Sequence, residues 1–81
     1  MSEVTYGQLD EALQSLGFSV QTDEEKHKVY RHPSSGALVV LPEFPPGEAV
    51  LSRHLTAVRG TLDAYGIADP LAFAAKIHKA S

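Results

Sequence analysis

The sequence HKVYRHPSSGALVVL, residues 27–41, contains the pattern that decides the fold. Its first part, residues 27–32, is rich in β-branched and aromatic side chains and predicts a strand. Residues 33–36 predict a tight connection, because proline ends strand pairing and Gly36 tolerates a positive φ. Residues 37–41 are apolar at every position. This predicts the central or most buried strand of a sheet.

A third strand is expected before this pair. Residues 18–22 alternate apolar and polar side chains, as a half-buried strand does, and residues 23–25 form an acidic turn. Short turns between successive strands predict an antiparallel meander. Successive residues of a strand point to opposite faces, so either Val29 or Tyr30 can anchor the second strand in the core. The sequence leaves this choice open.

A helix is predicted before the strands. Thr5 and Gln8 fit a capping box, which marks a helix start. Apolar residues then recur at steps of three and four, as on one face of a helix: Tyr6, Leu9, Leu13 and Leu16. Gly17 suits the left-handed position just after a helix end, and Phe18 is expected to fold back on Leu13.

Two further helices are predicted after the strands. Residues 42–47, PEFPPG, predict a stiff, exposed loop. The next helix ends at Gly66 and has its apolar face at Leu51, Leu55, Val58 and Leu62. Asp69 and Pro70 fit the start of a third helix that runs to about Lys79. This helix is rich in alanine and its apolar face is weak, so we expect it to be accessory.

The expected fold class is α+β with the element order α-β-β-β-α. It has a three-stranded antiparallel sheet with helices packed on one face, plus an extra C-terminal helix. The 81 residues predict one domain, 1–81, with a core over residues 5–67 and an accessory helix over about 69–80. The longest apolar runs are about five residues, so no membrane association is expected. We see no signal-peptide pattern and expect a cytoplasmic protein.

Composition excludes several classes of site. The chain has no cysteine, which excludes disulfides, Fe–S clusters and thiolate zinc sites. The net charge of −3 at first argues against a nucleic-acid partner. However, the first 25 residues hold six acidic side chains and no basic one, whereas residues 26–59 hold five basic and two acidic ones. A polyanion responds to the local field of this middle segment more than to the average charge.

One histidine lies within a cluster of basic residues. His27 is flanked by Lys26 and Lys28, and Arg31 follows on the same strand. Histidine can act as acid or base near neutral pH, and neighbouring cations can stabilise the phosphorane of RNA cleavage. The same pattern also fits a solvent-exposed strand whose charged side chains prevent it from pairing with strands of other molecules. No metal-binding motif such as H-E-x-x-H is present, and we expect neither a metal nor another cofactor.

The chain resembles the HicA toxins, small ribonucleases of the HicA–HicB toxin–antitoxin systems. The resemblance covers about residues 5–67. Its most specific part is residues 27–33, HKVYRHP, which resembles the family's histidine segment. Three other segments also resemble the family pattern: Leu16-Gly17-Phe18, the apolar strand 37–41 with its proline-rich loop, and residues 59–67.

The resemblance implies a double-stranded-RNA-binding-like fold and a metal-independent endoribonuclease that acts on mRNA. It places the family's catalytic histidine on His27, as acid/base. RNA phosphates would then be held by Lys26, Lys28 and Arg31, with Arg59 contributing from the second helix. The expected partners are RNA and a HicB-like antitoxin protein.

Two departures from the family pattern keep other hypotheses open. The Gly-Ser that usually precedes the histidine is Glu25-Lys26, and the loop after the third strand carries Glu43 and Glu48 where the toxins are often lysine-rich. The alternative is therefore a non-catalytic HicA-like module that binds protein or RNA through the exposed face or the edge of the sheet. An edge strand would also allow a homodimer. A third hypothesis is a small domain unrelated to the toxins.

Overall fold

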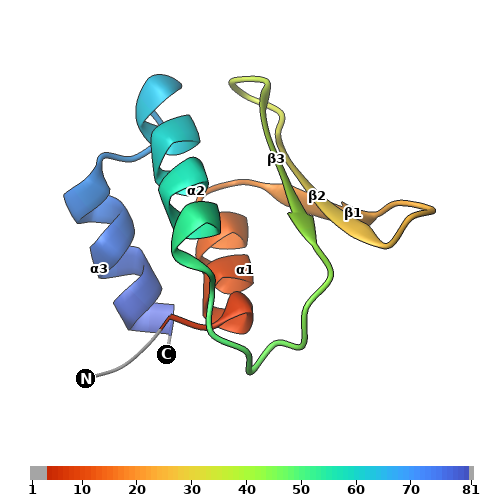
Figure 1. The fold of residues 1–81 in the computed structure, drawn as a ribbon. Helices are drawn as coiled ribbons and strands as arrows, with labels where there is room; N and C mark the ends of the chain where they lie inside the picture. Colours follow the sequence, from red (N-terminus) through yellow and green to blue (C-terminus); the bar gives the residue numbers. More distant parts are fainter. Residues whose placement is uncertain (1–3, 81) are drawn as a thin grey trace.

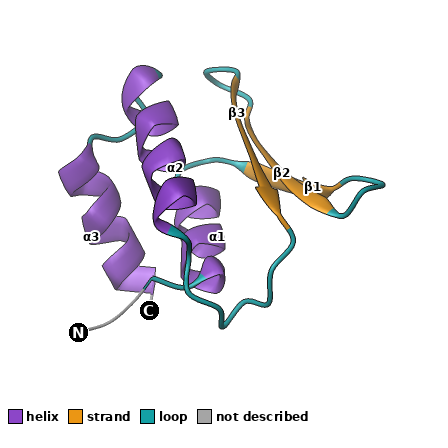
Figure 2. Ribbon diagram, in the orientation of Figure 1, coloured by secondary structure: helices purple, strands orange, loops and turns teal. Residues whose placement is uncertain are grey.

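The computed structural model describes residues 4–80. Its elements follow the order α1 (Tyr6–Ser15), β1 (Ser19–Thr22), β2 (His27–His32), β3 (Ala37–Pro42), α2 (Ser52–Ala64) and α3 (Pro70–Ala80). The helices lie together on one side of the sheet (Figure 1). Among the described residues, no helix covers the opposite face (Figure 2). The predicted α+β class, the element order and the additional C-terminal helix are confirmed.

The sheet is antiparallel with β2 in the centre and β1 and β3 at its edges. Residues 37–41 are therefore not the central strand, but with three buried side chains β3 is the most buried strand, as the sequence predicts as the other possibility. A meander with two tight turns places its second strand in the middle. The inward side chains of β3 are buried: Ala37, Val39 and Leu41. The outward side chains Leu38 and Val40 are 49% and 51% exposed.

Both ends of α1 form as the sequence predicts. At the start, the Thr5 hydroxyl accepts the N–H of Gln8 (3.2 Å), and the Gln8 side chain accepts the N–H of Thr5 (2.8 Å). At the end, Gly17 has a φ of +100°, and the N–H of Phe18 donates to the carbonyl of Leu13 (3.1 Å). These bonds satisfy backbone groups that have no partner inside the helix.

His32 fastens the end of α1 to the sheet. Its Nε2 lies 3.0 Å from the carbonyl oxygen of Leu16, and its Nδ1 lies 2.8 Å from the hydroxyl of Ser35. Its ring packs against Phe18, with the ring centroids 5.0 Å apart. A Cβ atom at Gly17 would lie 3.2 Å from Nε2 of His32. Position 17 therefore needs glycine both for its backbone conformation and for this close approach.

Helix α3 lies against α1 and α2, on their side away from the sheet (Figure 1). Its Phe73 is fully buried and its Ile77 is nearly so, and both belong to the same core cluster as the sheet and the other helices. The helix is thus part of the core, although its sequence suggested an accessory role. Two large apolar side chains one turn apart are enough to anchor this helix in the core.

The loop between β3 and α2 is tied to the start of α1. The N–H of Tyr6 donates to the carbonyl of Glu48 (3.0 Å), and the N–H of Gly7 donates to the carbonyl of Pro46 (2.9 Å). These N–H groups lie in the first turn of the helix, where no carbonyl of the helix can accept them. The loop is therefore held at its far end, in addition to being stiffened by its prolines.

Candidate functional site

Strand β2 sends alternate side chains to two different environments. Tyr30 is buried, and its hydroxyl donates to Oδ1 of Asp10 on α1 (2.7 Å). Burial, together with the hydrogen bond and the negative charge of Asp10, raises the pKa of the Tyr30 hydroxyl, which keeps it protonated as a donor. Tyr30, and not Val29, is therefore the core anchor. His27, Val29 and Arg31 consequently lie on the open face of the sheet.

The turn between β1 and β2 is organised by Asp23. Its Oδ1 accepts the backbone N–H of Glu25 (2.9 Å) and of His27 (2.8 Å). Its own N–H donates to the carbonyl of His27 (2.9 Å), and its carbonyl accepts the N–H of Lys26 (3.1 Å). Lys26 ends the turn with a φ of +64°, in the left-handed region. A three-residue loop whose last residue is left-handed is a common hairpin connection.

The carboxylate of Asp23 also faces the His27 ring. Its Oδ2 lies 3.7 Å from Nδ1 of His27, and the two side chains are 43% and 41% exposed. The charged neighbour of the imidazole in the structure is thus a carboxylate, whereas the sequence suggested lysines. The ring remains accessible to a ligand from solvent.

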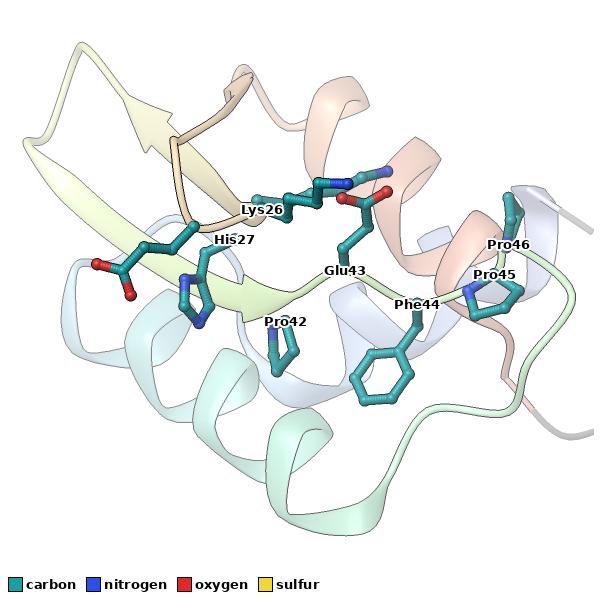
Figure 3. A pocket seen from close by; sticks show the side chains of 9 residues that line it. Lys26, His27, Pro42, Glu43, Phe44, Pro45 and Pro46 are labelled. Atoms are coloured by element: carbon teal, nitrogen blue, oxygen red, sulfur yellow. The ribbon is translucent and has the colours of Figure 1, made fainter.

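An open groove of about 620 Å³ lies between this turn and the loop after β3. Its two walls are formed by the segments 25–28 and 42–46. In the close view, the His27 ring and Pro42 lie on one side of the strand, whereas Lys26 and Glu43 point to the other side (Figure 3). A ligand that touches both the imidazole and the lysine amines must therefore cross the end of the sheet.

The loop wall of the groove is held by aromatic packing. The ring of Phe44 stacks on Tyr6, with centroids 4.4 Å apart and planes 10° from parallel. The Tyr6 hydroxyl lies 2.9 Å from Nδ1 of His54 on α2, and it accepts the N–H of Leu51 (3.3 Å). One cluster thus joins α1, the loop and α2, so this wall is rigid while the groove stays open.

The structure brings together three of the five predicted site residues. Lys26, His27 and Lys28 line the groove. Arg31 is exposed on the open face and lines a separate hollow of about 320 Å³. Arg59 is exposed on α2 and lines neither space.

Acidic side chains share the groove with the two lysines. Glu25 lies in one wall and Glu43 in the other. With His27 neutral, the charges of these two glutamates balance those of Lys26 and Lys28. The groove therefore has no strong positive field of its own that would attract a polyanion.

Two residues that shape the site are not indicated by the pattern of the sequence. Asp23 was assigned only to a turn, although an Asp at this position is the usual signal for a side chain that accepts backbone N–H groups of its own turn. Phe44 was assigned only to the loop. Its packing on Tyr6 joins residues 38 positions apart, and no local pattern indicates such a contact.

Within residues 4–80, no helix has the length and apolar character needed to span a bilayer. No group of three or more His, Asp or Glu side chains suited to a metal is found in the same part of the chain. Comparison with models of protein families, with curated proteins and with solved structures gives no match.

Proposed function

We propose that this protein is a HicA-like RNA-binding domain that cleaves mRNA without a metal ion, with His27 as the acid/base group. The observation that carries the proposal is the accessible His27 imidazole at the edge of an open groove that also contains Lys26 and Lys28. An imidazole is suited to proton transfer near neutral pH, and lysine amines are suited to phosphate. The resemblance in residues 27–33 supports the same assignment.

The reaction requires only groups of this kind. As base, His27 takes the proton of a ribose 2′-hydroxyl, whose oxygen attacks the adjacent phosphorus. The bond between phosphorus and the 5′-oxygen breaks, and the leaving oxygen takes a proton from the protonated imidazole or from water. The products are a 2′,3′-cyclic phosphate and a 5′-hydroxyl, with no oxidant or cofactor consumed.

RNA is expected to cross the end of the sheet. Lys26 and Lys28 would contact phosphates next to the cleaved bond, while Arg31 and Arg59 lie farther away and would contact only a longer RNA. Each such contact adds to the salt dependence of binding. In the cytoplasm, a HicB-like antitoxin would neutralise the activity by covering the groove.

The experiment is a cleavage assay on a labelled RNA with purified wild type, His27→Ala and Gln21→Ala. Gln21 is an exposed residue paired with Val29 on the open face, so its substitution is the matched control. We expect His27→Ala to lose about 100-fold or more of the rate, the usual share of an acid/base group, and Gln21→Ala to lose none. A chelator should not change the rate. Wild type that leaves RNA intact, or equal rates for wild type and His27→Ala, would contradict the proposal.

A second candidate function is a non-catalytic binding module, and the open face of the sheet favours it. Leu38 and Val40 are 49% and 51% exposed there, and Val29 pairs with Val40. An apolar surface without aromatic side chains is better suited to a protein than to stacked bases. The partner would be an antitoxin-like protein or, through the β3 edge, a second copy of the chain.

Binding measured at two salt concentrations separates these candidates. RNA that binds without being cleaved, with affinity falling steeply as salt rises, would indicate an RNA-binding module. Absence of RNA binding at low salt would indicate a protein partner. In that case Val40→Lys should prevent the association, whereas Glu11→Ala, at an exposed position of α1 on the other side of the sheet, should not. The readout is light scattering for a homodimer and titration calorimetry for a purified partner.

A further inference from the structure

We propose that Asp23 is the positioning residue of His27 and holds the neutral imidazole with its proton on Nδ1. This inference rests on the proposed function for its catalytic meaning, but it concerns a property of the free protein. Asp23 lies four residues before His27 in the sequence, and in the structure its carboxylate faces the imidazole ring.

The backbone fixes the carboxylate before it meets the imidazole. Oδ1 of Asp23 accepts two N–H groups, from Glu25 at 2.9 Å and from His27 at 2.8 Å. With one oxygen bound twice, the side chain has little freedom to rotate, and Oδ2 stays directed at Nδ1 of His27, 3.7 Å away. The donor of one of these bonds is the backbone of His27 itself, so the carboxylate is fixed relative to the residue that it orients.

The chemistry of the two groups decides the tautomer. An ionised carboxylate only accepts hydrogen bonds, so a neutral imidazole gains by placing its single proton on the nitrogen that faces it. Nε2 is then unprotonated and can take the proton of a 2′-hydroxyl. At 3.7 Å the two atoms are beyond hydrogen-bond length, so in the free protein the carboxylate acts through its negative charge, which favours an N–H that points at it. The same carboxylate would stabilise the imidazolium formed after proton transfer.

Asp23→Asn is the informative substitution. An Asn side chain keeps an oxygen that can accept the two N–H groups of the turn, so the hairpin is retained. Its second atom becomes an NH₂ group, which donates and cannot accept the proton on Nδ1. Glu24→Gln is the matched control, because it removes the same charge from an exposed residue of the same turn.

The tautomer is read from long-range ¹H–¹⁵N correlation spectra at about pH 9, where imidazoles are neutral. His27→Ala assigns the signal. We expect the Nδ1–H form in wild type and in Glu24→Gln, and a shift towards the Nε2–H form in Asp23→Asn. The Nε2–H form in wild type, or an unchanged tautomer in Asp23→Asn, would overturn the proposal.

Cleavage rates supply the second readout. We expect Asp23→Asn to cleave about tenfold more slowly than Glu24→Gln under single-turnover conditions. This is well below the about 10⁴-fold loss for a buried Asp–His pair, because both side chains are partly exposed. Equal rates in the two variants would show that the carboxylate does not act in catalysis and would overturn the catalytic role proposed for Asp23. If wild type does not cleave RNA, the proposed function fails, and the tautomer alone decides the role of Asp23.

Discussion

Gly17→Ala tests the junction between α1 and the sheet. The new Cβ would lie 3.2 Å from Nε2 and 3.5 Å from Cδ2 of His32. The ring cannot easily retreat, because Nδ1 is held by Ser35 and one face packs on Phe18. The left-handed backbone costs an alanine about 1–2 kcal/mol. Displacing the imidazole from the Leu16 carbonyl adds about 1 kcal/mol.

The free energy of unfolding should therefore fall by about 2–3 kcal/mol, which is a large share of the roughly 5 kcal/mol expected for a domain of this size. Urea unfolding followed by circular dichroism measures it. With a slope near 1 kcal/mol per molar, the midpoint should fall by about 2–3 M. Gly66→Ala is the control, because Gly66 ends α2 with a φ of +67° and a Cβ there would meet no atom within 4 Å.

Comparing the two variants isolates the contribution of His32. We expect Gly66→Ala to lose about 1 kcal/mol less than Gly17→Ala, and Gly17→Ala to cost less in a His32→Ala background than in wild type. Equal losses at the two glycines, together with an unchanged cost in the His32→Ala background, would refute the reasoning. The close approach of the imidazole would then have no energetic consequence.

Three further predictions concern the turn, the central strand and α3. Lys26→Gly should stabilise the protein by about 1 kcal/mol in thermal unfolding, because a glycine adopts φ near +64° without strain, and it should weaken RNA binding by one phosphate contact. The pKa of Tyr30 is raised in the native state. The contribution of its hydroxyl to the free energy of unfolding should therefore be complete below about pH 10 and should be lost as the pH rises further. Tyr30→Phe should remove this alkaline decline in urea midpoints, at a cost of about 1 kcal/mol at pH 7 from the lost bond to Asp10. Phe73→Ala should cost about 3–5 kcal/mol and leave little folded protein by circular dichroism; a loss below about 1 kcal/mol would show that α3 is accessory after all.

The parts of the fold that local sequence determines were predictable. The capping box at Thr5 and the left-handed glycines after α1 and α2 are contained within a few residues, so the helix ends follow from the sequence alone. The turns between the strands are equally local, and they imply the meander.

What the sequence did not determine depends on partners far along the chain. Val29 and Tyr30 are both apolar enough to anchor β2, and the choice is made by Asp10, twenty residues away. Leu38 and Val40 predict burial by composition, yet no element of residues 4–80 covers their face of the sheet. At the site, lysines flank His27 in the sequence, whereas the side chain beside its ring is that of Asp23, from the other end of the turn.

The double use of the Asp23 carboxylate links the fold of the hairpin tip to the state of the imidazole. The oxygens of one rigid group bind the amides of Glu25 and His27 on one side and face the His27 ring on the other. Protonation of His27 would draw the carboxylate towards the ring and would therefore change the protection of these two amides. Their hydrogen-exchange rates would therefore report the protonation state of the imidazole. These rates can be read without attaching a probe to the protein.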